Sequence, residues 1–109
     1  MRYINIDHEG KINDQEPFFA NGTSLQGGID ISYKKLVKVF GEPNAKSDGY
    51  KTDAEWIVFT INGVATIYNY KNGRNYLGNE GLDVENITDW NIGGRTRDVI
   101  KWVKLALEK

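Results

Sequence analysis

The sequence predicts an α+β fold: a small antiparallel sheet with two amphipathic helices packed on one face. Two segments carry apolar side chains at helical spacing, and an Asn-Gly pair separates two apolar runs in the middle of the chain. The predicted elements follow the order β-α-β-β-β-α. With 109 residues, the chain is long enough for one domain, residues 1–109, and too short for two.

The first helix is the best-marked element of the N-terminal half. Before it, residues 3–6 predict a short edge strand, and residues 22–28, which glycines flank, predict a strand or loop with close backbone approach. Ser32 is a good N-cap, and Gly41 followed by Pro43 ends the helix. Its apolar face consists of Tyr33, Leu36, Val37 and Phe40.

A β-hairpin is predicted from residues 54–61 and 64–70, which Asn62-Gly63 joins. A two-residue turn at that pair sets the register of the two strands. The pairs it predicts are Ile61–Val64, Phe59–Thr66 and Ile57–Tyr68. Both hairpin faces are largely apolar, so we expect both to be buried. The two helices cover one face, and self-association is the simplest cover for the other. The alternative is that the first 20 residues fold over it.

The C-terminal part begins with a Gly- and Asn-rich loop over residues 71–83. Residues 87–92, centred on Trp90, predict a third main strand. Thr96 is the expected N-cap of the second amphipathic helix. The apolar stripe of that helix consists of Val99, Trp102, Val103 and Ala106.

Composition excludes several classes of function. The formal net charge of −1 argues against a protein that coats DNA or RNA, because such a protein needs a basic stripe. The chain has no cysteine, which excludes disulfides, zinc fingers and thiol nucleophiles. No apolar run approaches the length of a membrane span, and the N-terminus has no apolar signal core. We therefore expect a cytoplasmic protein without a membrane partner.

Catalysis has little support in the sequence. The only histidine, His8, lies in a polar segment and is expected at the surface, without the spacing of a metal site. Ser24 lacks the Gly-x-Ser-x-Gly setting of a hydrolase nucleophile. Glu55 is the carboxylate of most interest, because we expect it to be partly buried beside Trp56 and Tyr70. We predict no catalytic residue, metal or cofactor.

The stretch GGRTR, residues 93–97, predicts an anion-binding site. Arg95 and Arg97 stand where the helix dipole disfavours positive charge. An anion between these arginines, Thr96 and the free backbone amides of the helix start would explain their position. The alternative is that Asp98, or Asp89 across the turn, neutralises the arginines.

Further candidate ligand residues flank the predicted third strand. Arg74 lies in the Gly/Asn loop, and arginine grips phosphate through a planar fork. Tyr68 and Tyr70 offer rings for stacking on a nucleobase, and Asn75 and Asn91 offer amides for its polar edges. Together with Arg95, Thr96 and Arg97, these residues form the predicted ligand site.

Four sequence blocks resemble a family of small bacteriophage proteins. The blocks are GTSLQG, DGYKTDAEW, VATIYNYKNGRNYLG and ITDWNIGG, and they span most of residues 22–94. This family is similar to the anti-Thoeris sponge proteins, which sequester signalling nucleotides of the cyclic ADP-ribose type without destroying them. The resemblance implies an oligomer of α+β protomers with ligand pockets of arginines, aromatics and asparagines at their interfaces. Residues 95–97 and the Tyr68–Arg74–Asn75 loop are the positions to which that ligand role would apply.

The leading hypothesis is therefore a phage counter-defence protein in the cytoplasm of the infected bacterium. It would be a non-catalytic homo-oligomer that sequesters a cyclic nucleotide immune signal. The second hypothesis is a phage protein that inhibits a host defence protein, such as a CRISPR nuclease, by direct binding. A small nucleotide-cleaving enzyme is the third, and the lone His8 argues against it.

Overall fold

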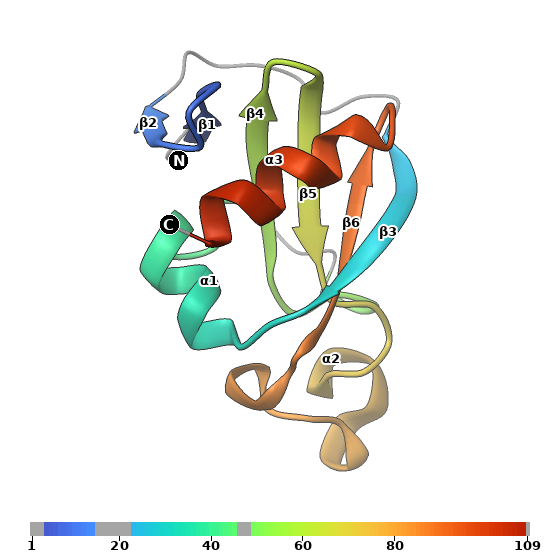
Figure 1. Ribbon diagram of the computed structural model, residues 1–109. Helices are drawn as coiled ribbons and strands as arrows, with labels where there is room; N and C mark the ends of the chain where they lie inside the picture. Colours follow the sequence, from blue (N-terminus) through green and yellow to red (C-terminus); the bar gives the residue numbers. More distant parts are fainter. Residues whose placement is uncertain (1–3, 15–22, 46–48, 109) are drawn as a thin grey trace.

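The computed structural model describes residues 4–14, 23–45 and 49–108. One mixed sheet has the strand order β2-β1-β4-β5-β6-β3 (Figure 1). The strands are β1 Ile4–Ile6, β2 Ile12–Asp14, β3 Ser24–Asp30, β4 Glu55–Thr60, β5 Gly63–Tyr68 and β6 Asp89–Gly94. The helices are α1 Tyr33–Phe40, α2 Arg74–Leu77 and α3 Asp98–Leu107, with short 3₁₀ turns η1 Gly78–Glu80 and η2 Val84–Asn86. The α+β class predicted from the sequence is confirmed.

The sheet differs from the antiparallel prediction at β1. This strand pairs in parallel with β4, Ile4 lying opposite Val58, and antiparallel with β2 on its other side. It is therefore an inner strand and not the predicted edge strand. The side chains of Ile4 and Ile6 are fully buried, so this position is set by packing with residues distant in the sequence.

The two longer helices begin and end close to the predicted positions. Ser32 caps α1, its hydroxyl accepting the Lys35 N–H at 3.1 Å, and Gly41 ends it with a φ of 83°. The helix α3 begins at Asp98, so its N-cap is Arg97 and not the predicted Thr96; the Thr96 hydroxyl accepts the Asp98 N–H at 3.3 Å. Figure 1 shows α3 crossing in front of β4 and β5, with α1 beside its C-terminal end.

The central hairpin has a different register from the predicted one. Phe59 pairs with Val64 and Thr60 with Gly63, so the turn consists of Ile61 and Asn62. The reason is the Thr60 hydroxyl, which donates to the Gly63 carbonyl at 2.7 Å and accepts the Asn62 N–H at 3.1 Å. The change moves no side chain to the other face of the hairpin. Residues that were predicted to share a face, such as Phe59 and Thr66, therefore still do so.

The sequence did not show which face of the hairpin belongs to the core. In the structure it is the face that carries Trp56, Val58 and Ile67. These side chains are fully buried, and the Trp56 and Trp90 rings meet edge to face with centroids 5.5 Å apart. The Trp56 indole N–H donates to the Gly41 carbonyl at 2.9 Å, which connects the sheet to the end of α1. One apolar core therefore lies between this face and the helices.

The opposite face does not leave a broad apolar surface open. Phe59 is 6% exposed and Val64 1% exposed in the single chain. The expected open apolar face, which was the reason for predicting self-association, is therefore not present at these residues. Further along the same strands the face becomes polar, and a hollow opens there.

Candidate ligand-binding pocket

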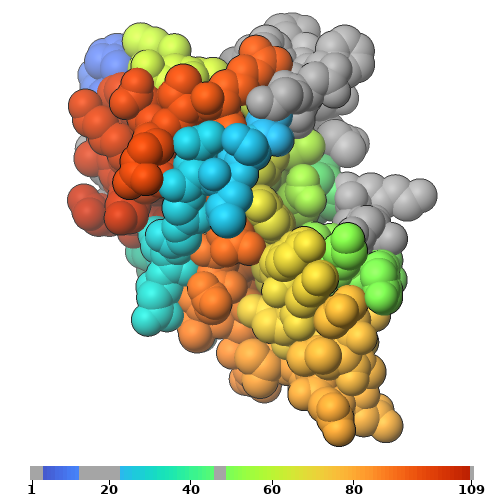
Figure 2. Space-filling model, turned by 90° about the vertical axis from the view of Figure 1, so that its right-hand side faces the viewer, coloured from blue at the N-terminus to red at the C-terminus, as the bar shows by residue number. Residues whose placement is uncertain are grey.

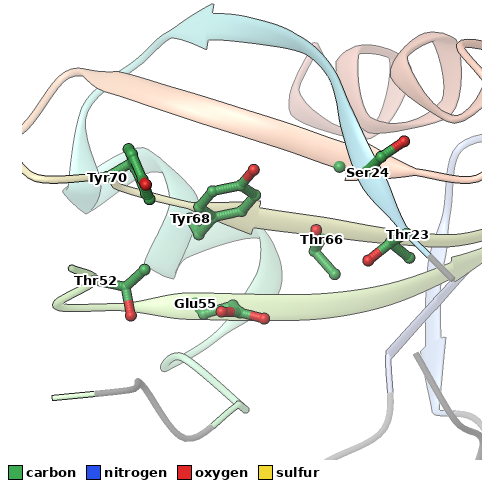
Figure 3. Close-up of a pocket in the computed structure, with 8 residues that line it drawn as sticks. Thr23, Ser24, Thr52, Glu55, Thr66, Tyr68 and Tyr70 are labelled. Carbon is green, nitrogen blue, oxygen red and sulfur yellow. The ribbon is translucent and has the colours of Figure 1, made fainter. Parts of the chain in front are cut away.

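A pocket of about 260 Å³ lies on the sheet face opposite the core. Its walls come from β3, β4, β5, β6 and the segments that adjoin them; Figure 2 shows β3 and the segment that follows β5 on this side of the molecule. The residues that line it are Thr23, Ser24, Thr52, Glu55, Thr66, Tyr68, Tyr70 and Gly93 (Figure 3).

Strand register brings the central residues of the pocket together. Glu55 lies directly opposite Tyr68, and Tyr68 lies opposite Asn91 on β6. Paired residues point to the same face, so these three side chains form one row across three strands. Thr66 and Gly93 belong to the next row, and Figure 3 shows Thr66 beside Tyr68 and Glu55.

Glycine at position 93 keeps the pocket open. A Cβ atom there would lie 2.5 Å from the Thr66 hydroxyl oxygen and 3.5 Å from a ring carbon of Tyr68. The first of these separations is too short for any real contact. Thr66 and Tyr68 therefore occupy the space that a side chain at position 93 would need, and the hollow lies beyond them.

The lining is rich in hydroxyl groups and carries one acidic charge. Burial raises the pKa of the Tyr68 phenol above its usual 10.0, and the negative charge of Glu55 raises it further, with a smaller effect from Tyr70. Tyr68 therefore stays neutral at physiological pH and keeps its O–H as a donor. Among the described lining residues, Glu55 is the one acidic side chain. The arrangement suits a ligand with several hydroxyl groups and an aromatic ring.

Two of the predicted ligand residues, Asn75 and Arg74, make contacts that hold the α2 segment in place. The Asn75 side-chain amide donates to the Thr52 carbonyl at 2.9 Å, and its backbone N–H donates to the Asp53 carboxylate at 3.2 Å. Arg74 forms an ion pair with Asp83, with 2.6 Å between Nε and Oδ1. These contacts hold the loop in shape, and neither side chain lines the pocket.

A buried asparagine completes the attachment of this loop. Asn69 is 0% exposed, and its amide donates to the Asp53 carboxylate at 2.8 Å and to the Asn72 side-chain oxygen at 3.0 Å. Its own oxygen accepts the Asp53 N–H at 2.7 Å. Asn69 is therefore a structural anchor of this loop.

Of the GGRTR stretch, Gly93 lines the pocket, and residues 95–97 lie beyond its Ser24 end. Gly94 pairs with Ser24, a lining residue, and the exposed residues Arg95, Thr96 and Arg97 follow. Asp89 begins β6 and Arg95 comes after its end, so the length of that strand separates the two residues. Asp98 occupies the first turn of α3, where an acidic side chain suits the helix dipole.

The structure therefore divides the predicted ligand residues into three groups. Tyr68 and Tyr70 line the pocket, and Asn91 lies opposite Tyr68. Residues 95–97 flank its Ser24 end, and residues 74–75 hold the α2 loop. Sequence analysis did not assign to the ligand site the other lining residues, which are Thr23, Ser24, Thr52, Glu55, Thr66 and Gly93. Strand alternation was the available signal for Thr66, since it places that residue on the same face as Tyr68.

Other kinds of site have less support in the structure. His8 is exposed and lies 3.8 Å from the Glu9 carboxylate, as expected for a surface residue. Within the described ranges there is no cluster of three or more side chains able to hold a metal ion, and no helix there is long and apolar enough to cross a membrane. A comparison with known protein families, curated proteins and solved structures finds no match for this chain.

Proposed function

We propose that this protein is a phage counter-defence protein that binds and sequesters a cyclic nucleotide signal of the cyclic ADP-ribose type without cleaving it. The observation that carries the proposal is the pocket in which Glu55, Thr66 and Tyr68 meet on the outer face of the sheet. Its volume of about 260 Å³ suits the nucleoside part of such a ligand. The phosphates would remain at the rim.

The lining groups match the chemistry of a ribosylated base. The rings of Tyr68 and Tyr70 offer faces on which a base can stack. A carboxylate such as Glu55 accepts hydrogen bonds from two neighbouring hydroxyls of a ribose. Thr66 and the neutral Tyr68 phenol add groups that both donate and accept.

The phosphates are proposed to lie outside the pocket. The described lining carries no basic side chain, so a diphosphate would lie close to a cation at the rim. Arg95 and Arg97 follow the pocket's Ser24 end, where an arginine fork offers paired donors to phosphate. They remain the proposed anion-binding residues at this end.

Binding without turnover follows from the groups in the wall. Hydrolysis of a glycosidic bond generally uses two carboxylates on opposite sides of the bond. The described lining offers Glu55 and no second carboxylate or histidine. We therefore propose sequestration, with the ligand released intact. The homo-oligomer implied by the family resemblance is a separate part of the proposal, because a single chain already forms this pocket.

The direct test is to incubate the protein with cyclic ADP-ribose, remove unbound ligand, heat-denature the complex and analyse the released molecule. Intact cyclic ADP-ribose supports sequestration, and ADP-ribose or smaller fragments that increase with time would identify an enzyme. Tyr70→Ala should reduce the bound amount. Ile61→Ala is its control, because Ile61 is also an exposed large apolar side chain and does not line the pocket.

The protein-inhibitor hypothesis is favoured by one other observation. The segment from residue 70 to residue 82 exposes three large apolar side chains, Tyr70, Leu77 and Leu82, each between 42% and 47% accessible. Exposed apolar groups close together mark protein-binding surfaces. Leu77→Glu combined with Leu82→Glu should abolish counter-defence activity and leave cyclic ADP-ribose binding intact if this hypothesis is right.

A further inference from the structure

Lys71 has a backbone conformation that its side chain disfavours. Among the described residues it is the one non-glycine residue with a positive φ, 61°. Its N–H donates to the Lys51 carbonyl at 2.7 Å, so the surrounding structure holds it in this conformation. The next two residues are Asn72 and Gly73, types that adopt positive φ more readily. Backbone strain of this kind gathers at ligand sites, where it serves to aim a side chain.

The strained backbone places the lysine ammonium group against aromatic rings at the pocket rim. Lys71 Nζ lies 5.2 Å from the centroid of the Tyr70 ring and 5.3 Å from that of Tyr76. Tyr76 in turn packs on Tyr50, with 5.1 Å between centroids. Attraction between a cation and ring faces restricts an otherwise flexible side chain. The Lys71 charge is therefore held in place beside Tyr70, a residue of the pocket wall.

Lys71 also places a positive charge beside the described lining of the pocket. The described lining carries the negative Glu55 and no basic side chain. Tyr68, opposite Glu55, is the last residue of β5, and Tyr70 lies two residues beyond it. An anion bound at Lys71 therefore lies beyond the end of β5, outside the cross-strand row formed by Glu55 and Tyr68. An ammonium group in that position attracts an anion without bringing it onto the carboxylate.

We infer that Lys71 binds a phosphate group of the nucleotide whose base or ribose occupies the pocket. This inference rests on the proposed function and gives a second candidate position for the diphosphate, at the end of the pocket opposite to Ser24. Because the two phosphates are bonded to each other, the ligand uses one of the two ends, and comparing Lys71→Gln with Arg95→Ala plus Arg97→Ala shows which. The ligand would then extend from the wall around Tyr68 across the Tyr70 ring to the ammonium group. Lysine serves here as a point charge, the way in which it commonly binds phosphate.

The experiment compares wild type, Lys71→Gln and Lys71→Gly by calorimetric titration with cyclic ADP-ribose, ADP-ribose and adenosine, at low and high salt. Both variants should bind the two phosphate-bearing probes about tenfold or more weakly, and the salt dependence of binding should be smaller. Adenosine affinity should stay unchanged. Lys71→Gly should also raise the melting temperature, because glycine adopts a φ of 61° without strain.

Lys101→Gln is the matched control. Lys101 Nζ lies 5.0 Å from the Trp102 ring centroid, so this variant also removes a lysine from an aromatic face, on α3 and outside the pocket wall. It should bind all three probes like the wild type. Wild-type affinity for ADP-ribose in Lys71→Gln would overturn the role of Lys71 and leave the proposed function standing. An equal loss for adenosine would overturn it too, since the effect would then not concern phosphate. If the wild type binds none of the three probes, both proposals fail together.

Discussion

The two faces of β4, β5 and β6 are made by alternate residues of the same strands, yet they differ in almost every property. The face toward α3 carries Trp56, Ile67 and Trp90, which are fully buried and apolar. The opposite face carries Glu55 and Tyr68, which are partly buried and polar. One face therefore provides most of the stability, and the other presents groups able to bind a ligand.

The number of apolar residues in a strand does not by itself decide whether both of its faces enter a core. The hairpin has apolar residues on both sides, but the core cluster that includes residues of α1 and α3 lies on one side, and the pocket lies on the other. Glycine is needed at position 93, because Thr66 and Tyr68, which line the pocket, occupy the space that a side chain there would fill. Substitutions on the two faces should accordingly have different consequences.

The largest expected effect is on the core face. Trp56→Ala should lower the free energy of unfolding by about 3–5 kcal/mol, because it removes a fully buried indole and leaves a cavity. Tyr68→Ala on the pocket face should cost less than half as much, since its ring is only partly buried. Chemical denaturation followed by circular dichroism measures both values. Equal costs would mean that the two faces do not divide stability and binding as described.

The next effect concerns the hollow itself. Gly93→Ala should destabilise the fold by about 1–3 kcal/mol through overpacking and should weaken ligand binding, because the new methyl group meets the Thr66 hydroxyl. Adding Thr66→Ala removes the atom 2.5 Å from the new Cβ and should recover most of the lost stability. A double-mutant cycle by denaturation tests this coupling. Additive costs would show that the clash with Thr66 is not the cause.

A smaller effect is expected at alkaline pH. The pKa of Tyr68 is raised by burial and then by Glu55, so the folded state holds the phenol proton more tightly than the unfolded state. This contribution to stability is complete below pH 10 and is lost as the pH rises through the folded-state pKa. Glu55→Gln should lower the Tyr68 pKa and reduce the alkaline loss of stability.

Ultraviolet titration of the phenols measures this shift directly. Tyr33 needs a control, because burial and the charges of Glu42 and Glu85 raise its pKa as well. In a Tyr33→Phe background, the remaining late-titrating phenol should be Tyr68. If Glu55→Gln leaves that titration unchanged, the electrostatic coupling between Glu55 and Tyr68 is wrong.

The smallest effect on stability is expected from Arg95→Ala combined with Arg97→Ala. Both residues are exposed, so the free energy of unfolding should change by no more than about 0.5 kcal/mol. Binding of a phosphate-bearing ligand should nevertheless weaken, by about 1.5–3 kcal/mol for each lost charge-assisted contact. Chemical denaturation measures the change in the free energy of unfolding, and calorimetric titration of the same preparation measures the change in ligand binding. Unfolding of this variant would support the alternative in which acidic neighbours neutralise the arginines.

Features of the fold that depend on neighbouring residues were predictable from the sequence. Ser32 and Gly41 mark the ends of α1 because a cap acts within one turn of helix. The hairpin between β4 and β5 was predicted for the same reason, although the Thr60 hydroxyl moved its register. Local chemistry was therefore sufficient for most elements, and for placing Thr66 and Tyr68 on one face.

The tertiary structure decided what depends on residues far apart in the chain. No local pattern shows that β1 pairs in parallel with β4, or that Asn75 bonds to Thr52 instead of facing a ligand. The sequence by itself determined the α+β class, the helix ends and the alternation of each strand. The choice of the buried face, and with it the position of the pocket, came only from packing, because burial is settled by the whole set of contacts that the chain makes at once.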